Sequence, residues 1–239
     1  HGGFASHIKV PSAFLCKVPS EVLKKYPLEH LAVIADAIST PYQVIKKSEL
    51  IAGDLAIVIG VGGVGVYGAL LAKIAGAKVI ALDISDEKLK IASENGVDAI
   101  LNIKDLDIKS IKDKVKDLAK KIGAPKYGWK IFEISGTASG QELAFNLITF
   151  ASTLSIVGFT MEKLSVRLSN LMAFDAKLIG TWGCRAELYP EVLKLVANDQ
   201  LKITSFIQTF PMSEINEVFN KTLHHHYSKR SILIPDSSN

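Results

Sequence analysis

Three glycines in the first third of the chain have the spacing of a loop that binds a diphosphate. Residues 60–65 read G-x-G-x-x-G and follow an apolar run at residues 55–59. In such a loop the first glycine permits a sharp turn and the second lets backbone N–H groups approach a pyrophosphate. The third lets the following helix pack closely against the strand. Gly60, Gly62 and Gly65 occupy these positions, with Gly63 and Val64 between them, so the stretch predicts a dinucleotide site.

An acidic residue follows at the distance that this chemistry requires. Asp83 lies 23 residues after Gly60, where ~20 residues are expected between the turn and the acid that binds ribose. Its carboxylate can accept hydrogen bonds from both ribose hydroxyls and would repel a 2′-phosphate, which favours NAD over NADP. The competing interpretation is a glycine-rich turn without a ligand, and the surrounding elements favour the nucleotide.

The elements around the turn are those that a dinucleotide-binding loop needs. Apolar runs at residues 55–59 and 78–82 predict buried strands, and the helical pattern between them covers residues 64–75. A membrane span is the alternative, because residues 55–72 carry no charge. Five glycines interrupt that run where a turn is needed, and a charged residue and a strand follow directly. We therefore reject a membrane-spanning segment.

Strands and helices continue to alternate along the chain. Further strands are expected at residues 99–102, 129–134, 153–158 and 177–181. This pattern predicts an α/β fold, a doubly wound six-stranded parallel sheet of the Rossmann type. Ligands of such sheets bind beyond the carboxyl ends of the strands. One crevice should therefore be lined by residues 60–64, Asp83, residues 134–136 and residues 157–159.

The composition is typical of a globular protein. Apolar residues make up 48% and charged residues 22% of the chain, and the net charge is +4. Many lysines lie on the helix expected at residues 108–122, with no interleaved aromatic residues, so we expect a solvated helix face and no nucleic-acid partner. Two cysteines without a C-x-x-C pair, and no signal peptide, predict a cytoplasmic protein.

The first residues read as the interior of a longer chain. His1 is not an initiator methionine, and residues 4–10 have strand character that ends at Pro11. Such a strand needs partners, and none is evident nearby in the sequence. We therefore expect the chain to be the C-terminal part of a longer protein.

Several motifs together resemble the medium-chain, zinc-type alcohol dehydrogenase family. They are GGFASHIKVP, STPYQV, Gly53-Asp54 before VIGVGGVG, DISDEK, FEISGT, IVGF and KRSIL. The resemblance implies three segments: residues 1–37 as the end of a β-rich, GroES-like catalytic domain, residues 38–182 as the NAD-binding domain, and residues 183–239 as a return to the catalytic domain. It also implies NAD-dependent oxidation of an alcohol by a homo-oligomer, a dimer or tetramer.

Within the family, the resemblance extends to members that act on a ring hydroxyl of a coenzyme A thioester. The motifs concerned are WKIFEISGT, VGFTMEK, VRLSNLMAF and WGC. They imply a small-molecule substrate of the acyl-CoA class. Two alternatives stay open: a relative that oxidises another alcohol or a polyol, and a non-catalytic module that binds NAD.

The resemblance also implies roles for individual residues. It assigns the phosphate turn to residues 60–65 and the ribose acid to Asp83, with Lys88 near the adenosine ribose. The backbone that holds the nicotinamide would come from Ile134, Val157, Gly158 and Phe159. Thr40 would lie beside the nicotinamide ring, and Arg230 would reach the pyrophosphate.

Asp36 matches the position of the third protein ligand of the family's catalytic zinc, which is usually cysteine. A carboxylate is an acceptable zinc ligand, and a charged residue in an apolar stretch needs a partner. The alternative is a capping aspartate before the helix at Thr40. The family's other zinc ligands and its proton-relay hydroxyl lie upstream of the matched region. We therefore expect this chain alone to bind NAD but to turn over poorly or not at all.

Three consecutive histidines, residues 224–226, end a predicted helix. Consecutive helical residues point about 100° apart, so these rings are poorly placed to share one metal ion. Favourable placement near a helix C-terminus is the simpler interpretation.

Overall fold

The computed structural model describes residues 3–224 and 226–236, which form two compact units. One unit is Thr40–Gly183, and the other comprises the segments up to Ser39 and from Cys184 onward. Among the described residues, no helix combines the length and apolarity needed to cross a bilayer.

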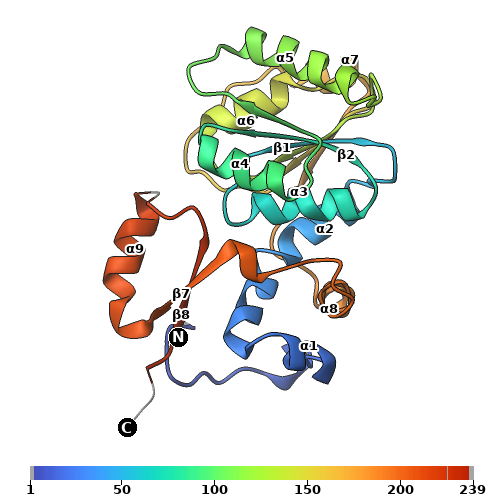
Figure 1. Cartoon of the computed structure of the whole chain (residues 1–239). Helices are drawn as coiled ribbons and strands as arrows, with labels where there is room; N and C mark the ends of the chain where they lie inside the picture. Colours follow the sequence, from blue (N-terminus) through green and yellow to red (C-terminus); the bar gives the residue numbers. More distant parts are fainter. Residues whose placement is uncertain (1–2, 225, 237–239) are drawn as a thin grey trace. The chain divides into compact units, whose positions relative to one another are not determined.

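A six-stranded, all-parallel sheet forms the centre of the Thr40–Gly183 unit (Figure 1). Its order is β3-β2-β1-β4-β5-β6. This is the doubly wound order: successive strands are added on one side of β1 up to β3 and then, from β4, on its other side. The strands are β1 (Leu55–Ile59), β2 (Lys78–Asp83), β3 (Ala99–Asn102), β4 (Lys130–Glu133), β5 (Thr153–Ile156) and β6 (Lys177–Gly180). The predicted fold class is therefore confirmed.

The register places the functional strand ends side by side. Ile59 of β1 pairs with Leu82 of β2 on one side and with Glu133 of β4 on the other. Glu133 in turn pairs with Ile156 of β5. The turns that follow β1, β2, β4 and β5 thus lie together at the carboxyl ends of the strands, as the predicted crevice requires.

Helices cover both faces of this sheet (Figure 1). On one face, α3 (Gly65–Ile74) and α4 (Asp86–Glu94) pack against β1, β2 and β3. On the other, α5 (Ile108–Lys121) and α6 (Ala138–Asn146) bury Ile111, Val115 and Leu143 against Ile57 and its neighbours. All residues of β1, and all residues of β2 after Lys78, are buried, because helices cover both faces of the sheet. These strands therefore read as nearly continuous apolar runs.

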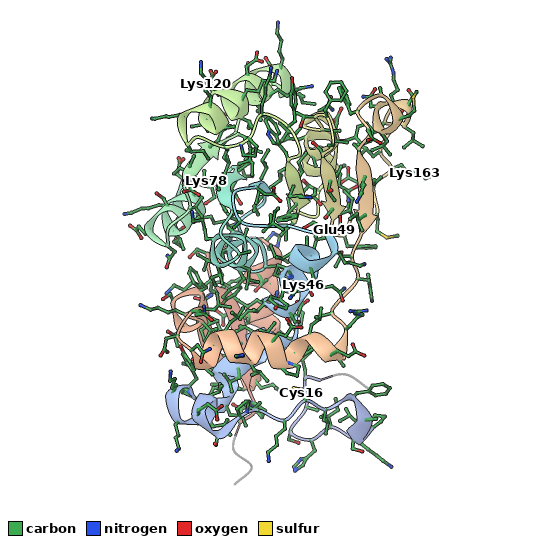
Figure 2. The ribbon with its side chains drawn as sticks, turned by 90° about the vertical axis from the view of Figure 1, so that its right-hand side faces the viewer. Cys16, Lys46, Glu49, Lys78, Lys120 and Lys163 are labelled. Carbon is green, nitrogen blue, oxygen red and sulfur yellow. The ribbon has the colours of Figure 1, made fainter. Side chains whose placement is uncertain are left out.

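The outer surface of α5 is rich in lysine. Lys114, Lys116, Lys120 and Lys121 are exposed, and Figure 2 labels Lys120 at this helix, near the top of the view. One of these lysines pairs with Asp113 at 3.6 Å. The lysines therefore form a solvated helix face opposite the buried stripe of α5.

A further helix is expected from the sequence over residues 141–150. The corresponding helix α6 begins at Ala138, three residues earlier, and ends at Asn146. The Oγ1 of Thr137 accepts a hydrogen bond from Gly140 N at 3.0 Å and so caps the helix. A threonine N-cap satisfies an N–H group that would otherwise lack a partner, and this signal was missed.

The second unit consists of short elements: α1 (Ser20–Lys25), the 3-10 helix η2 (Leu28–Ala35), α8 (Tyr189–Ala197), α9 (Ile215–Leu223), β7 (Ile207–Pro211) and β8 (Arg230–Ile234). Strands β7 and β8 pair in parallel as a two-stranded sheet.

The prediction of a strand at residues 4–10 is wrong. These residues pair with no strand of the described chain and are exposed. Of the three histidines, His224 forms the C-cap of α9, and His225 lies outside the described residues.

Two connecting elements complete the description. Helix α2 (Ser39–Lys47) begins with Pro41 in its first turn, where the missing N–H costs nothing. The short helix α7 (Ser169–Ala173) precedes β6.

Candidate nucleotide-binding site

The turn between β1 and α3 is packed at its two ends and open in the middle. Gly60 has φ +84°, and a Cβ there would lie 2.6 Å from the Cα of Ser135. A Cβ at Gly65 would lie only 1.8 Å from the carbonyl oxygen of Gly60. At Gly62, in contrast, a Cβ would meet nothing within 4 Å. Gly60 and Gly65 therefore serve close packing, and Gly62 leaves space where a ligand can approach the backbone.

The start of α3 is suited to an anion. Val64 occupies the N-cap position, and no side chain caps the helix there. The first N–H groups of a helix have no intrahelical partner, and the helix dipole adds positive potential at this end. Together with the open side of Gly62, this gives a site for the phosphates of a nucleotide.

Asp83 ties the turn to the end of β2. Its side chain is buried, with 7% exposure. Oδ2 accepts a hydrogen bond from Val61 N at 2.8 Å, and Oδ1 accepts one from Ser85 N at 3.0 Å. Each carboxylate oxygen retains a further lone pair, so acceptor capacity remains for the hydroxyls of a ribose. Lys88, half-buried in the first turn of α4, follows five residues later.

A pocket of about 280 Å³ lies at the same strand ends. Gly60 and Asp83 form part of its wall, and most of the remaining lining is aliphatic. The aliphatic residues include Ile84, Ile103, Leu106 and Ile108. An apolar pocket beside a ribose-binding acid suits a flat, uncharged ring. These residues were not predicted to line the site, because no local pattern marks them. Ile84, Ile103 and Leu106 come from the segments that follow β2 and β3, and Ile108 is the first residue of α5.

The ends of β4 and β5 meet beside the turn. Ile134 N donates to the carbonyl oxygen of Ile59 at 2.9 Å. Val157 N and Gly158 N both donate to the carbonyl oxygen of Glu133 at 3.0 Å. Phe159, the next residue, is exposed. The structure therefore brings the backbone that was expected to hold a nicotinamide next to the phosphate turn.

Thr40 is buried in the first turn of α2 and lies near the carboxyl end of β4. The link is Gly68 of α3, where a Cβ would lie 3.0 Å from Ile134 Cδ1 and 3.4 Å from Pro41 Cβ. Pro41 follows Thr40 directly, so α2, α3 and the end of β4 converge around Gly68. The role of Thr40 beside the nicotinamide ring stays a prediction.

Glu133 lies at the same strand ends and was not predicted from the sequence as a residue of the site. It is fully buried at the end of β4. Burial raises the pKa of its carboxyl above the ordinary value, against hydrogen bonds from Ser135 and Gly136 that lower it. The signal was present, since a charged residue in an apolar strand needs a partner. That argument was applied to Asp36 and not to Glu133.

Asp36 and Arg230 belong to the other unit and pair with each other. Arg230 Nη2 lies 2.9 Å from Asp36 Oδ2. The expectation that Asp36 is a buried carboxylate is wrong, because its side chain is 57% exposed and faces an arginine. Asp36 forms the C-cap of η2, three residues before α2 begins. A zinc role for Asp36 and a pyrophosphate role for Arg230 stay predictions.

The donor groups within the described residues do not by themselves form a zinc site. Among those residues, no group of three or more His, Cys, Asp or Glu could hold a metal ion. Asp36 is thus at most one ligand, and we derive no chemistry through zinc from this chain. The nucleotide site, in contrast, has the space, the helix terminus and the carboxylate that a dinucleotide needs.

Comparison with known families agrees with this geometry. Residues 63–198, more than half of the chain, match the family model described as zinc-binding dehydrogenase. The chain belongs to the zinc-binding dehydrogenase family. Of the residues expected to bind the cofactor, those from Gly63 to Phe159 fall within the match.

Individual members of this dehydrogenase family are similar over nearly the whole chain. An alcohol dehydrogenase from Geobacillus stearothermophilus is 28% identical over 222 residues, which cover 92% of this chain and 60% of the relative. The crystal structure of an alcohol dehydrogenase from the archaeon Aeropyrum pernix matches with a TM-score of 0.83 at 25% identity. That match covers 98% of this chain and 65% of the other.

A third protein shares the fold. Acetophenone reductase from Geotrichum candidum, solved in complex with NAD, has a TM-score of 0.74 at 23% identity, over 91% of this chain and 58% of its own. The chain spans 60% and 65% of the length of two of the curated relatives that it matches.

Proposed function

We propose that this chain is the cofactor-binding part of an NAD-dependent alcohol dehydrogenase. The observation that carries the proposal is the combination at the β1–α3 turn. Gly60 and Gly65 are packed, Gly62 is open, and the Asp83 carboxylate is bonded to the same turn with lone pairs to spare. In a member of the zinc-binding dehydrogenase family, this combination supports binding of NAD.

Each part of the site has a defined task in this proposal. The start of α3 holds the pyrophosphate, Asp83 accepts the ribose hydroxyls, and the aliphatic pocket receives the adenine. The strand ends at Ile134 and residues 157–159 orient the nicotinamide, with Thr40 beside it. When bound, NAD accepts hydride from the alcohol carbon, and the protein contributes orientation and charge stabilisation.

For the substrate, we propose the ring hydroxyl of 6-hydroxycyclohex-1-ene-1-carbonyl-CoA. The support is the resemblance of WKIFEISGT, VGFTMEK, VRLSNLMAF and WGC to the dehydrogenase that acts on this thioester. The alternatives are another alcohol or a polyol, and a non-catalytic module that responds to NAD.

Zinc enters the proposal only through Asp36, as one ligand of a site that residues outside this chain would complete. A free carboxylate would require Asp36 to leave Arg230. Metal analysis of the complete protein and its Asp36→Ala variant tests this role. We expect the variant to contain less zinc, and unchanged zinc content would contradict the zinc role of Asp36.

The cellular setting follows from the thiols. Cys16 and Cys184 are both free, which fits a reducing cytoplasm. We therefore place the proposed enzyme in the cytoplasm.

The experiment that tests the function uses the protein from the complete open reading frame. Initial rates with the acyl-CoA substrate and with polyols, each in the presence of NAD, separate the first two possibilities. NAD binding without turnover of any alcohol would favour the non-catalytic module. Absence of NAD binding would contradict the proposal altogether.

A further inference from the structure

Glu133 is a buried acid that no part of the proposed function has used. Its side chain has 0% exposure, and its Oε1 accepts hydrogen bonds from Ser135 N at 2.8 Å and Gly136 N at 3.2 Å. The Ser135 hydroxyl also donates to Oε1. Within the described part of the chain, Oε2 is buried and has no hydrogen-bond partner. A single carboxylate oxygen therefore holds Ser135 and Gly136 in the turn between β4 and α6.

The main chain of the same residue holds the neighbouring turn. The carbonyl oxygen of Glu133 accepts from Val157 N and Gly158 N, both at 3.0 Å. The two turns are also pressed together. A Cβ at Gly158 would lie 2.2 Å from Gly136 N and 2.9 Å from Glu133 Oε2. Glu133 is thus the residue that joins the end of β4 to the end of β5.

We propose that Glu133 is a positioning residue for the nicotinamide half of the bound cofactor. This inference rests on the proposed NAD-binding function. The two turns that Glu133 joins provide Ile134 and residues 157–159, which were assigned to the nicotinamide. The pyrophosphate and the adenosine ribose are assigned to the start of α3 and to Asp83. The turn between β4 and α6 meets the adenosine half only where Ser135 and Thr137 form part of the wall of the aliphatic pocket. The carboxyl of Glu133 acts by fixing the turns and does not itself touch the reacting atoms.

A positioning role of Glu133 predicts different effects of its substitution on the two halves of the cofactor. Loss of the Oε1 acceptor leaves the N–H groups of Ser135 and Gly136 without their partner, so the turn between β4 and α6 loses its defined geometry. Binding of NAD should therefore suffer more than binding of ADP-ribose, which lacks nicotinamide and meets this turn only at the pocket wall. A general loss of folded structure would weaken both ligands alike.

The experiment measures dissociation constants for NAD and ADP-ribose in the complete protein and its Glu133 variants. For Glu133→Ala we expect NAD affinity to fall by about tenfold or more, with ADP-ribose affinity within about twofold of wild type. Glu133→Gln keeps an oxygen at the Oε1 position and should restore NAD affinity to within about threefold. Glu94→Gln, on the exposed end of α4, is the matched control.

Every outcome bears on the proposal. If Glu133→Ala does not fold, Glu133→Asp replaces it, because the shorter side chain keeps the charge but withdraws the oxygen. Equal losses for both ligands, or no loss for NAD, would overturn the positioning role, as would a failure of glutamine to restore NAD binding. A wild-type protein that binds neither ligand would instead overturn the proposed function.

Discussion

At the scale of single residues, Asp83 has a structural role in addition to the ligand-binding role that the sequence predicts. The spacing from Gly60 predicted a ribose acid, and the structure adds a bond from Val61 N to Oδ2. The carboxylate therefore shapes the turn, in addition to its proposed contact with the ribose. Any substitution of Asp83 affects both the turn and the ligand, and a competing ligand helps to separate the effects.

Replacing Asp83 should change the choice between NAD and NADP. In Asp83→Ala, NAD loses charge-assisted hydrogen bonds worth ~1.5–3 kcal/mol, whereas NADP is relieved of repulsion at its 2′-phosphate. We expect the ratio of the NADP to the NAD dissociation constant to fall by about tenfold or more. Fluorescence titration with both cofactors measures this ratio. Asp117→Asn, exposed on α5, is the control, and an unchanged ratio would remove the ribose role.

Glu133 should make stability depend on pH. Burial raises its pKa in the folded protein above 4.5, so above that pH the unfolded chain releases a proton that the folded protein retains. The free energy of unfolding should therefore fall as pH rises from about 4.5 to the folded pKa. Glutamine does not titrate, so Glu133→Gln should gain stability relative to wild type over this range. Urea unfolding across pH tests this, and parallel curves would contradict it.

At the scale of elements, the β1–α3 turn separates packing from ligand binding. Gly65 and Gly62 are three positions apart, yet only Gly65 lies against backbone. The motif letters alone do not reveal this difference. The consequence is a pair of alanine variants with opposite expected effects.

In Gly65→Ala, the new Cβ meets the Gly60 carbonyl, and we expect a loss of ~1–3 kcal/mol of stability from overpacking. In Gly62→Ala, the Cβ enters open space, so stability should be nearly unchanged while NAD affinity falls. Thermal unfolding and NAD titration of both variants test these expectations. A Gly62→Ala protein with full NAD affinity would show that the phosphates lie elsewhere.

At the scale of the whole molecule, β6 is an edge of the sheet with an exposed apolar surface. Leu178 in this strand is 45% exposed, and Trp182 just beyond it is 88% exposed. Edge strands offer unpaired backbone groups to a partner. The family resemblance implies a homo-oligomer, and we expect its contact at this edge.

A charge at this edge should weaken the assembly. We expect Leu178→Lys to shift the complete protein toward smaller species in size-exclusion chromatography, because the lysine would have to be desolvated at the contact. Ile51→Lys, another exposed apolar position of the same unit, is the control. An unchanged elution volume for Leu178→Lys would place the contact elsewhere, and a monomeric wild type would contradict the oligomer.

Much of the fold could be read from the sequence because its signals are local. The apolar runs of β1 and β2, the glycine turn and Asp83 lie within 29 residues, from Leu55 to Asp83. Strand burial on both faces, helical periodicity and a glycine with positive φ each leave a mark on neighbouring residues. The prediction of a strand at residues 4–10 was wrong because β propensity alone does not supply a partner strand.

The tertiary structure alone decided which distant residues meet. Arg230 and Asp36 are 194 positions apart and form an ion pair, although the sequence predicted separate roles for them. The aliphatic pocket brings Asp83 together with Ile103 and Leu106, and Glu133 links two turns through its carboxyl and its carbonyl oxygen. Such contacts depend on how packed strands and helices bring remote segments together, and no local pattern of residue types encodes them.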